Sequence, residues 1–239
     1  MEKPVLFEIK DGVALITLNR PNRHNAIDRD LLIHLTNYIE KVAGNDGIRV
    51  AILTGNGKSF CSGLDLDVVE NEDILGLIAE VINFPDAIAA CKKPIIGAIN
   101  GPAITGGFEI ALNCDFLIAS EMASFKDTHA MVGIHPGWGM TQLLQQTVGQ
   151  RMAKQISFTS QTISADKAFK IGLVNEVVSH EELIPRAKQI ASEMCAVDQD
   201  MLVIIKGLIN FRNNATLDEA FAHERKGMRD FAKKNTGRS

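Results

Sequence analysis

Apolar residues in the first 180 positions alternate between short uninterrupted runs and longer stretches in which they recur every three or four residues. The uninterrupted runs predict β-strands, and because they contain almost no polar residue we expect these strands to be buried on both faces. They cover residues 13–19, 50–54, 95–99, 115–119 and 173–178. Predicted helices follow N-caps at Asp28 and Ser164 and cover 73–91, 140–148 and 151–158. Alternating strands and helices indicate an α/β domain with a parallel, covered sheet.

The last part of the chain has a different pattern. From Glu181 onward the spacing is helical throughout, with two or three helices separated near Asp198. We therefore expect an α/β core over residues 1–180 and a helical region over residues 181–239. A chain of 239 residues is long enough for one large domain, or for one domain with a small appendage.

Composition narrows the class of protein. Apolar residues make up 46% of the chain, enough for a full core, and the net charge is −4 without a block of like charges. This balance argues against a nucleic-acid or membrane-surface binder, but not against a small polyanionic ligand, which needs only a local basic patch. The four cysteines are scattered, so we expect a reducing compartment, the cytoplasm. No apolar run reaches membrane-spanning length.

The glycine-rich stretch at residues 94–109 is the first candidate for chemistry. A strand-like run leads through a bend to Gly106-Gly107, which open a predicted helix with Glu109 in its first turn. Bare glycines at a helix start leave backbone N–H groups exposed and favour negative charge. An amide that stabilises an oxyanion beside a carboxylate is a catalytic arrangement. A close-packed turn with a surface glutamate is the alternative reading of this pattern alone.

A second glycine turn, Cys61-Ser62-Gly63-Leu64-Asp65, follows the predicted strand at 50–54. If the two strands are neighbours, both turns aim N–H groups at one carbonyl oxygen and form an oxyanion hole, where losing one donor costs about 3–4 kcal/mol. Two unrelated turns are the alternative. Loops of the GxxxxGK[ST] and GxGxxG types are absent after the strands, which argues against nucleotide binding.

The segment Asp127-Thr128-His129 is a polar cluster within residues 124–139, which we predict to be a loop. Histidine titrates near neutral pH and can act as a general acid or base, although a loop histidine more commonly has a structural role. A metal site with His135 is disfavoured, because no third ligand is nearby in the sequence. Four basic residues offer either a small phosphate-binding patch or ordinary solvated loop charge: Arg20, Arg23, His24 and Lys58.

Six segments occur in order over nearly the whole chain and together resemble one known family. They are LNRPNRHNA (18–26), FCSGLD (60–65), AINGPAITGGFEIA (98–111), CDFLIA (114–119), PGWGMTQ (136–142) and the region 165–178. Each is weakly specific, but the ordered set resembles the enoyl-CoA hydratase/isomerase (crotonase) family. The resemblance implies a spiral of ββα repeats and a helical C-terminal region that forms a homotrimer or a dimer of trimers.

The resemblance also implies an acyl-CoA substrate and no metal or redox cofactor. The thioester carbonyl would lie between the N–H groups of Leu64 and Gly106, and Glu109 matches the first of two glutamates that hold water in hydratases of this family. The family pattern places CoA near the first loop and residues 60–66. The candidate CoA contacts are Arg23, His24, Lys58, Phe60, Ser62, Asp65 and Leu66.

The chain departs from the family where the second glutamate is expected. The motif F-x-x-P-E-x-x-x-G here reads FKDTHAMVG (125–133), so that His129 replaces the glutamate and Thr128 the proline. His129 can take over the acid/base role, Asp127 can supply the second carboxylate, or Glu109 can act alone, which suits an isomerase. We favour an enoyl-CoA hydratase, a lyase, with an enoyl-CoA isomerase and a non-catalytic acyl-CoA-binding protein as alternatives.

Overall fold

The computed structural model of the chain describes residues 3–71, 73–76 and 84–235. The chain forms two compact units, Met1–Ala196 and Val197–Ser239, and each is described by itself. Within the described residues, no helix is both long and apolar enough to cross a membrane.

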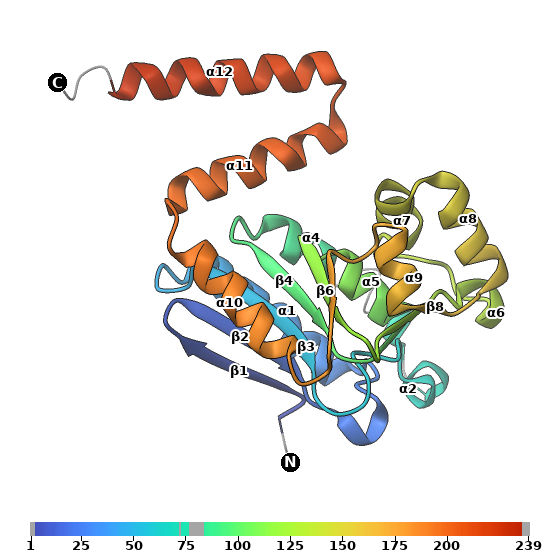
Figure 1. The fold of residues 1–239 in the computed structure, drawn as a ribbon. Coiled ribbons are helices and arrows are strands. Elements are labelled where there is room, and N and C mark those ends of the chain that lie inside the picture. Colours follow the sequence, from blue (N-terminus) through green and yellow to red (C-terminus); the bar gives the residue numbers. More distant parts are fainter. Residues whose placement is uncertain (1–2, 72, 77–83, 236–239) are drawn as a thin grey trace. The chain divides into compact units, whose positions relative to one another are not determined.

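The first unit is built on a six-stranded sheet with the order β1-β2-β3-β4-β6-β9 (Figure 1). β1 and β2 are antiparallel, and every other neighbouring pair is parallel. The strands are β1 (Val5–Lys10), β2 (Val13–Leu18), β3 (Val50–Gly55), β4 (Ile95–Ile99), β6 (Phe116–Ser120) and β9 (Glu176–Val178). The predicted parallel, covered sheet is confirmed, and β1 adds an antiparallel edge strand that the sequence pattern did not predict.

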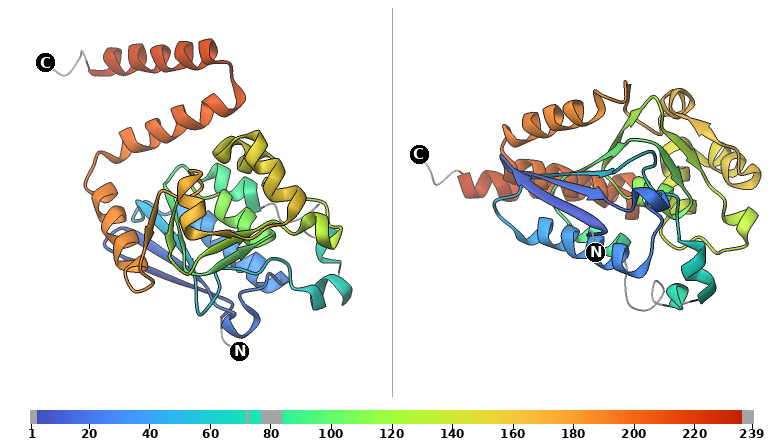
Figure 2. Two further views of the ribbon diagram at one scale, coloured as in Figure 1. Left: turned by 45° about the vertical axis from the view of Figure 1, so that its right-hand side comes forward. Right: turned by 90° about the horizontal axis from the view of Figure 1, so that it is seen from below.

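Helices α1 (Arg29–Gly44) and α10 (Leu183–Cys195) cover opposite faces of this sheet (Figures 1 and 2). Alternate residues of β3 belong to two hydrophobic clusters, one with the buried face of α1 and the other with that of α10. α1 begins as predicted, because the Asp28 carboxylate accepts a hydrogen bond from the Leu31 N–H at 2.8 Å.

The position of α10 changes the expected domain boundary. Its buried face is part of the core of the sheet, so the first compact unit ends at Ala196 rather than at residue 180. The helical spacing after Glu181 describes the local structure of this segment. It does not reveal that the first of its helices completes the α/β core.

A second, smaller sheet lies in the stretch that the sequence pattern treats as bends and loops. It contains β5 (Pro102–Ile104), β7 (Ser124–Lys126) and β8 (Ile163–Ser164), with β5 parallel to β7 and β7 antiparallel to β8. Strands of two or three residues are too short to show a periodic pattern, which is why they were not predicted.

Short helices connect the strands of the first unit. They are η1 (Pro21–Arg23), α2 (Leu66–Asn71), α4 (Phe84–Ala90), α5 (Gly106–Leu112), α6 (His129–Val132), α7 (Met140–Val148), α8 (Gln150–Thr159) and α9 (Ala165–Lys170). The helix predicted over 73–91 is seen in part as α4, which has Pro85 in its first turn. Residues 77–83 of that prediction lie outside the described residues.

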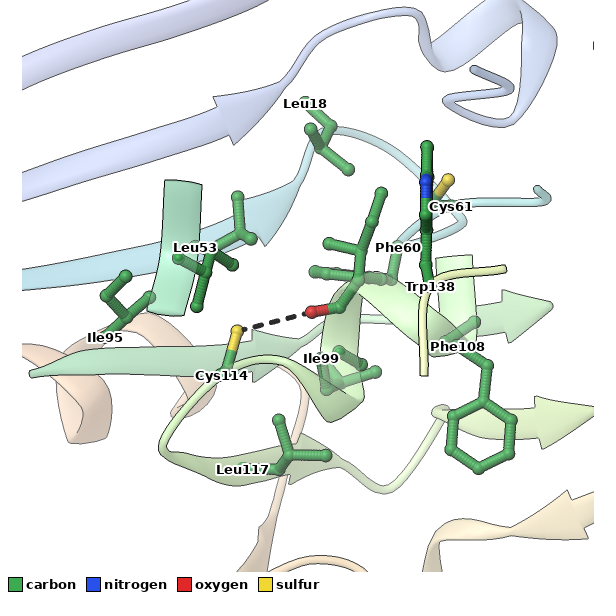
Figure 3. Packing of buried hydrophobic residues seen from close by; sticks show 14 of the residues in the cluster. Leu18, Leu53, Phe60, Cys61, Ile95, Ile99, Phe108, Cys114, Leu117 and Trp138 are labelled. Atoms are coloured by element: carbon green, nitrogen blue, oxygen red, sulfur yellow. Dashed lines mark hydrogen bonds between the residues drawn. The ribbon is translucent and has the colours of Figure 1, made fainter. Parts of the chain in front are cut away.

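The main hydrophobic core lies between the sheet and the helices α1, α4 and α5. Figure 3 shows apolar side chains of four parallel strands meeting Phe60, which directly precedes the first glycine turn, and Phe108, which directly follows Gly106-Gly107. The thiol of Cys114 donates to the carbonyl of Ile110 at 3.7 Å within this core. Both glycine turns are therefore anchored in the same core.

The second unit contains α11 (Gln199–Phe211), η2 (Arg212–Asn214) and α12 (Leu217–Asn235). The break between helices that the sequence predicts near Asp198 is observed, and Asp198 caps α11 by accepting from the Met201 N–H at 2.8 Å. The rings of Phe211 and His223 stack with their centroids 4.0 Å apart. The helical prediction for this part of the chain is confirmed.

Candidate active site

The two glycine turns are in backbone contact. Ile104 N–H donates to Cys61 C=O at 2.9 Å, and a Cβ on Gly107 would lie 2.1 Å from that carbonyl oxygen. Gly63 has a φ of +88°, and a Cβ there would lie 2.9 Å from Ile104 C=O. Glycine is needed at both positions because any side chain would push the turns apart. The alternative of two unrelated turns is thereby excluded.

This contact brings two free amides to one cavity of about 160 Å³. Leu64 forms a bridge with Ile27 through the flanking Gly63 C=O and Asp65 N–H, which leaves its own N–H without a protein acceptor among the described residues. Gly106 is the first residue of α5. Its N–H also lacks an acceptor among the residues that the structure describes. Both residues line the cavity, so two donors are available to one oxygen atom.

Glu109 lies beside these amides and is only 4% exposed, which excludes the alternative of a surface glutamate. Its Oε1 accepts hydrogen bonds from the N–H groups of Trp138 at 2.9 Å and Met140 at 3.2 Å. Its Oε2 lies 3.6 Å from Nε2 of His129. One carboxylate oxygen is thus fixed by the backbone, while the other faces the imidazole.

His129 is held from its other side by Asp127. Its Nδ1 lies 2.7 Å from Oδ1 of Asp127, and the same oxygen accepts from the His129 N–H at 3.0 Å. Burial alone would lower the pKa of His129, but the hydrogen bond to Asp127 and the nearby Glu109 carboxylate together outweigh burial and raise it to about 9. The imidazole is therefore positively charged at neutral pH, between two carboxylates.

Asp127 lies behind His129 and does not line the cavity. It is 2% exposed. Burial raises the pKa of its carboxyl, but the hydrogen bonds from His129 and Ser157 and the charge of His129 together outweigh burial, so that the pKa is lowered. An ionised Asp127 orients the ring of His129, and this geometry argues against its use as a second carboxylate in the cavity.

The cavity walls are mostly apolar, with a smaller polar portion. Such a site suits a ligand with an apolar portion and one polar reacting group. The apolar side chains in the wall belong to Leu64, Leu66, Leu75, Val132, Ile134 and Trp138, and the polar ones to Ser62, Thr105, Glu109, Thr128, His129 and His135.

The expected CoA contacts divide into two groups. Ser62 and Leu66 line the cavity. Phe60 is fully buried in the core and does not line the cavity, and a contact of this residue with CoA stays a prediction. Asp65 is also buried, and its carboxylate accepts from Arg20 at 3.1 Å and Arg23 at 2.9 Å, so it serves an internal ion-pair network instead.

The predicted phosphate contacts do not line this cavity. Arg23 pairs with Asp65 and Asp67, His24 Nδ1 lies 3.0 Å from the hydroxyl of Ser59, and Lys58 is exposed. Their contact with a phosphate stays a prediction.

Sequence reasoning missed the groups that hold the site in place. The backbone N–H groups of Trp138 and Met140 fix Glu109, although the motif at 136–142 was noted without a role. The hydroxyls of Thr105 and Thr128, on the two segments that carry Glu109 and His129, are in direct contact. No signal in the sequence indicated that these two threonines meet.

Comparison with known proteins identifies the fold and the family. The family model described as enoyl-CoA hydratase/isomerase matches residues 8–238. The chain belongs to the enoyl-CoA hydratase/isomerase family. It is 42% identical over 200 residues to a probable peroxisomal enoyl-CoA hydratase 1 of Arabidopsis thaliana, covering 83% of this chain and 75% of the relative. It is 36% identical to a crotonyl-CoA hydratase of Syntrophomonas wolfei, covering 92% of this chain and 86% of the relative.

Solved structures of the family have the same fold. An enoyl-CoA hydratase from Bacillus anthracis matches with a TM-score of 0.90 and 30% identity over 97% of this chain and 96% of that one. A monofunctional enoyl-CoA isomerase from M. smegmatis matches with a TM-score of 0.80 and 30% identity over 92% and 98%. The expected crotonase fold is confirmed. Because hydratases and isomerases of the family share it, the reaction must be argued from the site.

Proposed function

We propose that this protein is an enoyl-CoA hydratase, which adds water across the 2,3 double bond of an acyl-CoA thioester. The observation that carries the proposal is a buried carboxylate and a charged imidazole, 3.6 Å apart, at a cavity with two free amides. An acid, a base and an oxyanion hole are the three components that this addition needs.

In the proposed reaction the thioester oxygen accepts hydrogen bonds from the N–H groups of Leu64 and Gly106. Both donors are fixed in place before the substrate arrives, because the turns that carry them are in backbone contact. When water attacks Cβ, the electrons of the double bond move toward the carbonyl and negative charge develops on the oxygen. Fixed donors stabilise this enolate without reorganisation.

Glu109 and His129 then divide the proton transfers. Oε2 of Glu109 takes a proton from the attacking water, and Nε2 of His129 gives a proton to Cα. An imidazolium with a pKa of about 9 carries this proton at neutral pH. Afterwards Glu109 is protonated and His129 neutral, and a proton passing from Oε2 to Nε2 restores the starting state.

The test is an assay of the purified protein with crotonyl-CoA and 3-hexenoyl-CoA. We expect the ultraviolet absorbance of the 2-enoyl thioester to fall as water is added, with Glu109→Gln and His129→Ala as controls. No loss of this absorbance, despite measurable binding of the CoA ester, would contradict the hydratase and favour an acyl-CoA-binding protein.

Isomerisation of a 3-enoyl-CoA is the second candidate. It is favoured by the finding that only one carboxylate, Glu109, lines the cavity within the described residues, and a single carboxylate suffices for a 1,3-proton shift. Conversion of 3-hexenoyl-CoA without hydration of crotonyl-CoA would establish this reaction instead.

We also propose that the second unit mediates assembly into a homotrimer or a dimer of trimers. Its support is the set of apolar side chains exposed on α11 and α12, which include Ile209, Met228 and Phe231. Sedimentation equilibrium would show a monomer if this is wrong.

For location we propose the cytoplasm. Cys61, Cys91, Cys114 and Cys195 form no disulfide with one another, which fits a reducing compartment. Immunodetection in subcellular fractions would test it, and recovery of the protein in an organelle fraction would contradict it.

A further inference from the structure

Thr105 has a backbone conformation that threonine rarely adopts. Its φ is 49° and its ψ is −109°, a combination that glycine reaches without strain. A β-branched residue keeps such a conformation only where its surroundings hold it, and strain of this kind is concentrated at functional sites. We therefore expect the contacts of the Thr105 side chain to explain why threonine, and not glycine, occupies this position.

The polar groups of Thr105 reach both sides of the site. Its N–H donates to Lys126 C=O at 2.8 Å, and its C=O accepts from the Glu109 N–H at 2.9 Å. Its Oγ1 accepts from the Thr128 N–H at 3.2 Å and is in contact with the Thr128 hydroxyl. One residue is thus bonded to the chain of Glu109 and to both neighbours of Asp127.

The hydroxyl contact extends the small sheet into the site. The β5–β7 ladder ends where Ile104 lies opposite Lys126, and the Thr105–Thr128 contact is the next connection beyond it. On one side of this connection Gly106 follows directly, and on the other side His129 follows directly. Both threonines line the cavity.

We propose that Thr105 and Thr128 are positioning residues that fix the imidazole of His129 relative to the Gly106 amide. The inference rests on the proposed hydratase function, in which one substrate must meet the amide and the imidazole at the same time. Without the hydroxyl contact, the segment carrying His129 loses its connection to the segment carrying Gly106 and Glu109 beyond the end of the β5–β7 ladder, and can shift against it.

Thr105→Gly and Thr105→Ser separate this role from a purely structural one. Glycine removes both the strain and the hydroxyl, whereas serine keeps the hydroxyl. In Thr105→Gly we expect kcat to fall roughly tenfold to a hundredfold, because a small misplacement of reacting groups has effects of this size. KM should stay within about twofold, because Thr105 is not among the expected CoA contacts, and serine should restore most of kcat.

Asp11→Gly is the matched control. Asp11 also has a positive φ, of 52°, but it lies in the exposed turn between β1 and β2. Its replacement by glycine should leave kcat and KM unchanged. Equal kcat values in Thr105→Gly and wild type would overturn the proposal. If Thr105→Gly does not fold, Thr128→Val compared with Thr128→Ser makes the same test.

A second readout does not depend on activity. The imidazole of His129 faces Asp127 and Glu109, and its titration followed by NMR in the free protein reports how well those contacts are kept. Thr105→Gly should lower the pKa of His129, and Thr105→Ser should not. If the wild type does not hydrate crotonyl-CoA, the proposed function fails, but this titration still decides the inference. Identical titration curves in all three proteins would then contradict it.

Discussion

The turn at Gly63-Leu64 and the segment 127–129 each carry a buried carboxylate with a cationic partner, but they leave these groups in different states. Both oxygens of Asp65 accept from arginines, Oδ2 from Arg20 and Oδ1 from Arg23. The pKa of Asp65 is lowered, because these bonds outweigh the opposing effect of burial. Both oxygens of this carboxylate are thus engaged by the arginines, and Asp65 does not line the cavity.

The segment at 127–129 is arranged differently. Asp127 takes up only the Nδ1 side of His129, so Nε2 remains facing Glu109 at the cavity, 3.6 Å from Oε2. The backbone likewise takes up only one oxygen of Glu109. The comparison shows that an ion-pair cluster is suited to catalysis when its members are held by one atom and leave another free.

Glu109→Gln is the change expected to have the largest effect. The amide oxygen of glutamine can still accept from Trp138 and Met140, so the fold should be kept while the base is lost. We expect kcat for crotonyl-CoA hydration to fall by about 10²–10⁴-fold. The exposed Glu121→Gln is the matched control and should keep wild-type kinetics. A fall of less than tenfold would speak against Glu109 as the base.

His129→Gln should have the next largest effect. Glutamine can donate a hydrogen bond but cannot deliver a proton, so we expect a loss of about a hundredfold in kcat. His129→Glu restores the residue type of the family motif and should recover part of the rate. Steady-state kinetics of both variants test this, and full activity of His129→Gln would show that another group is the acid.

The pH dependence of kcat/KM tests the charge on His129. The active form is the imidazolium, which exists below its pKa of about 9, so the rate should fall as the pH rises through that value. Asp127→Asn weakens the bond that raises this pKa, and should move the fall to lower pH. An alkaline limb that stays in place in Asp127→Asn would contradict the orienting role of Asp127.

The smallest effects on catalysis are expected from changes in the ion-pair cluster of Asp65, Arg20 and Arg23. Asp65→Asn should lower the free energy of unfolding by about 1–3 kcal/mol, because a charged hydrogen-bond acceptor is lost. Arg23→Gln should lower it less, since that side chain is half exposed. Urea unfolding measures both. A loss of kcat in Asp65→Asn as large as in Glu109→Gln would remove the distinction between the two clusters.

Much of the fold was predictable because its signals are local. Uninterrupted apolar runs located β2, β3, β4 and β6, and the side chains of Asp28 and Ser164 marked helix starts. The small sheet was not predictable, because the pairing of its two- and three-residue strands depends on contacts distant in sequence. The place of α10 in the core depends equally on tertiary structure.

The candidate site shows the same limit. Glu109 and His129 were identified by residue type and motif, but the 3.6 Å between them is a property of the fold. Phe60 and Asp65 were assigned to the ligand because they lie in a motif, although their side chains point into the core and into an ion-pair network. The amides that hold Glu109 belong to the backbone, so they cannot be identified from the residue types in the sequence.

The close approach of Gly107 to the Cys61 carbonyl limits which parts of this protein can be re-engineered. Only glycine fits at position 107, since even the Cβ of alanine would push the two amide-bearing turns apart. The segment that carries His129 contributes to the cavity through its side chains, which can be varied without touching the contact between the two turns. A library that keeps the two turns intact and varies residues 127–135 would search for new reactions of thioester enolates without dismantling the part that stabilises them.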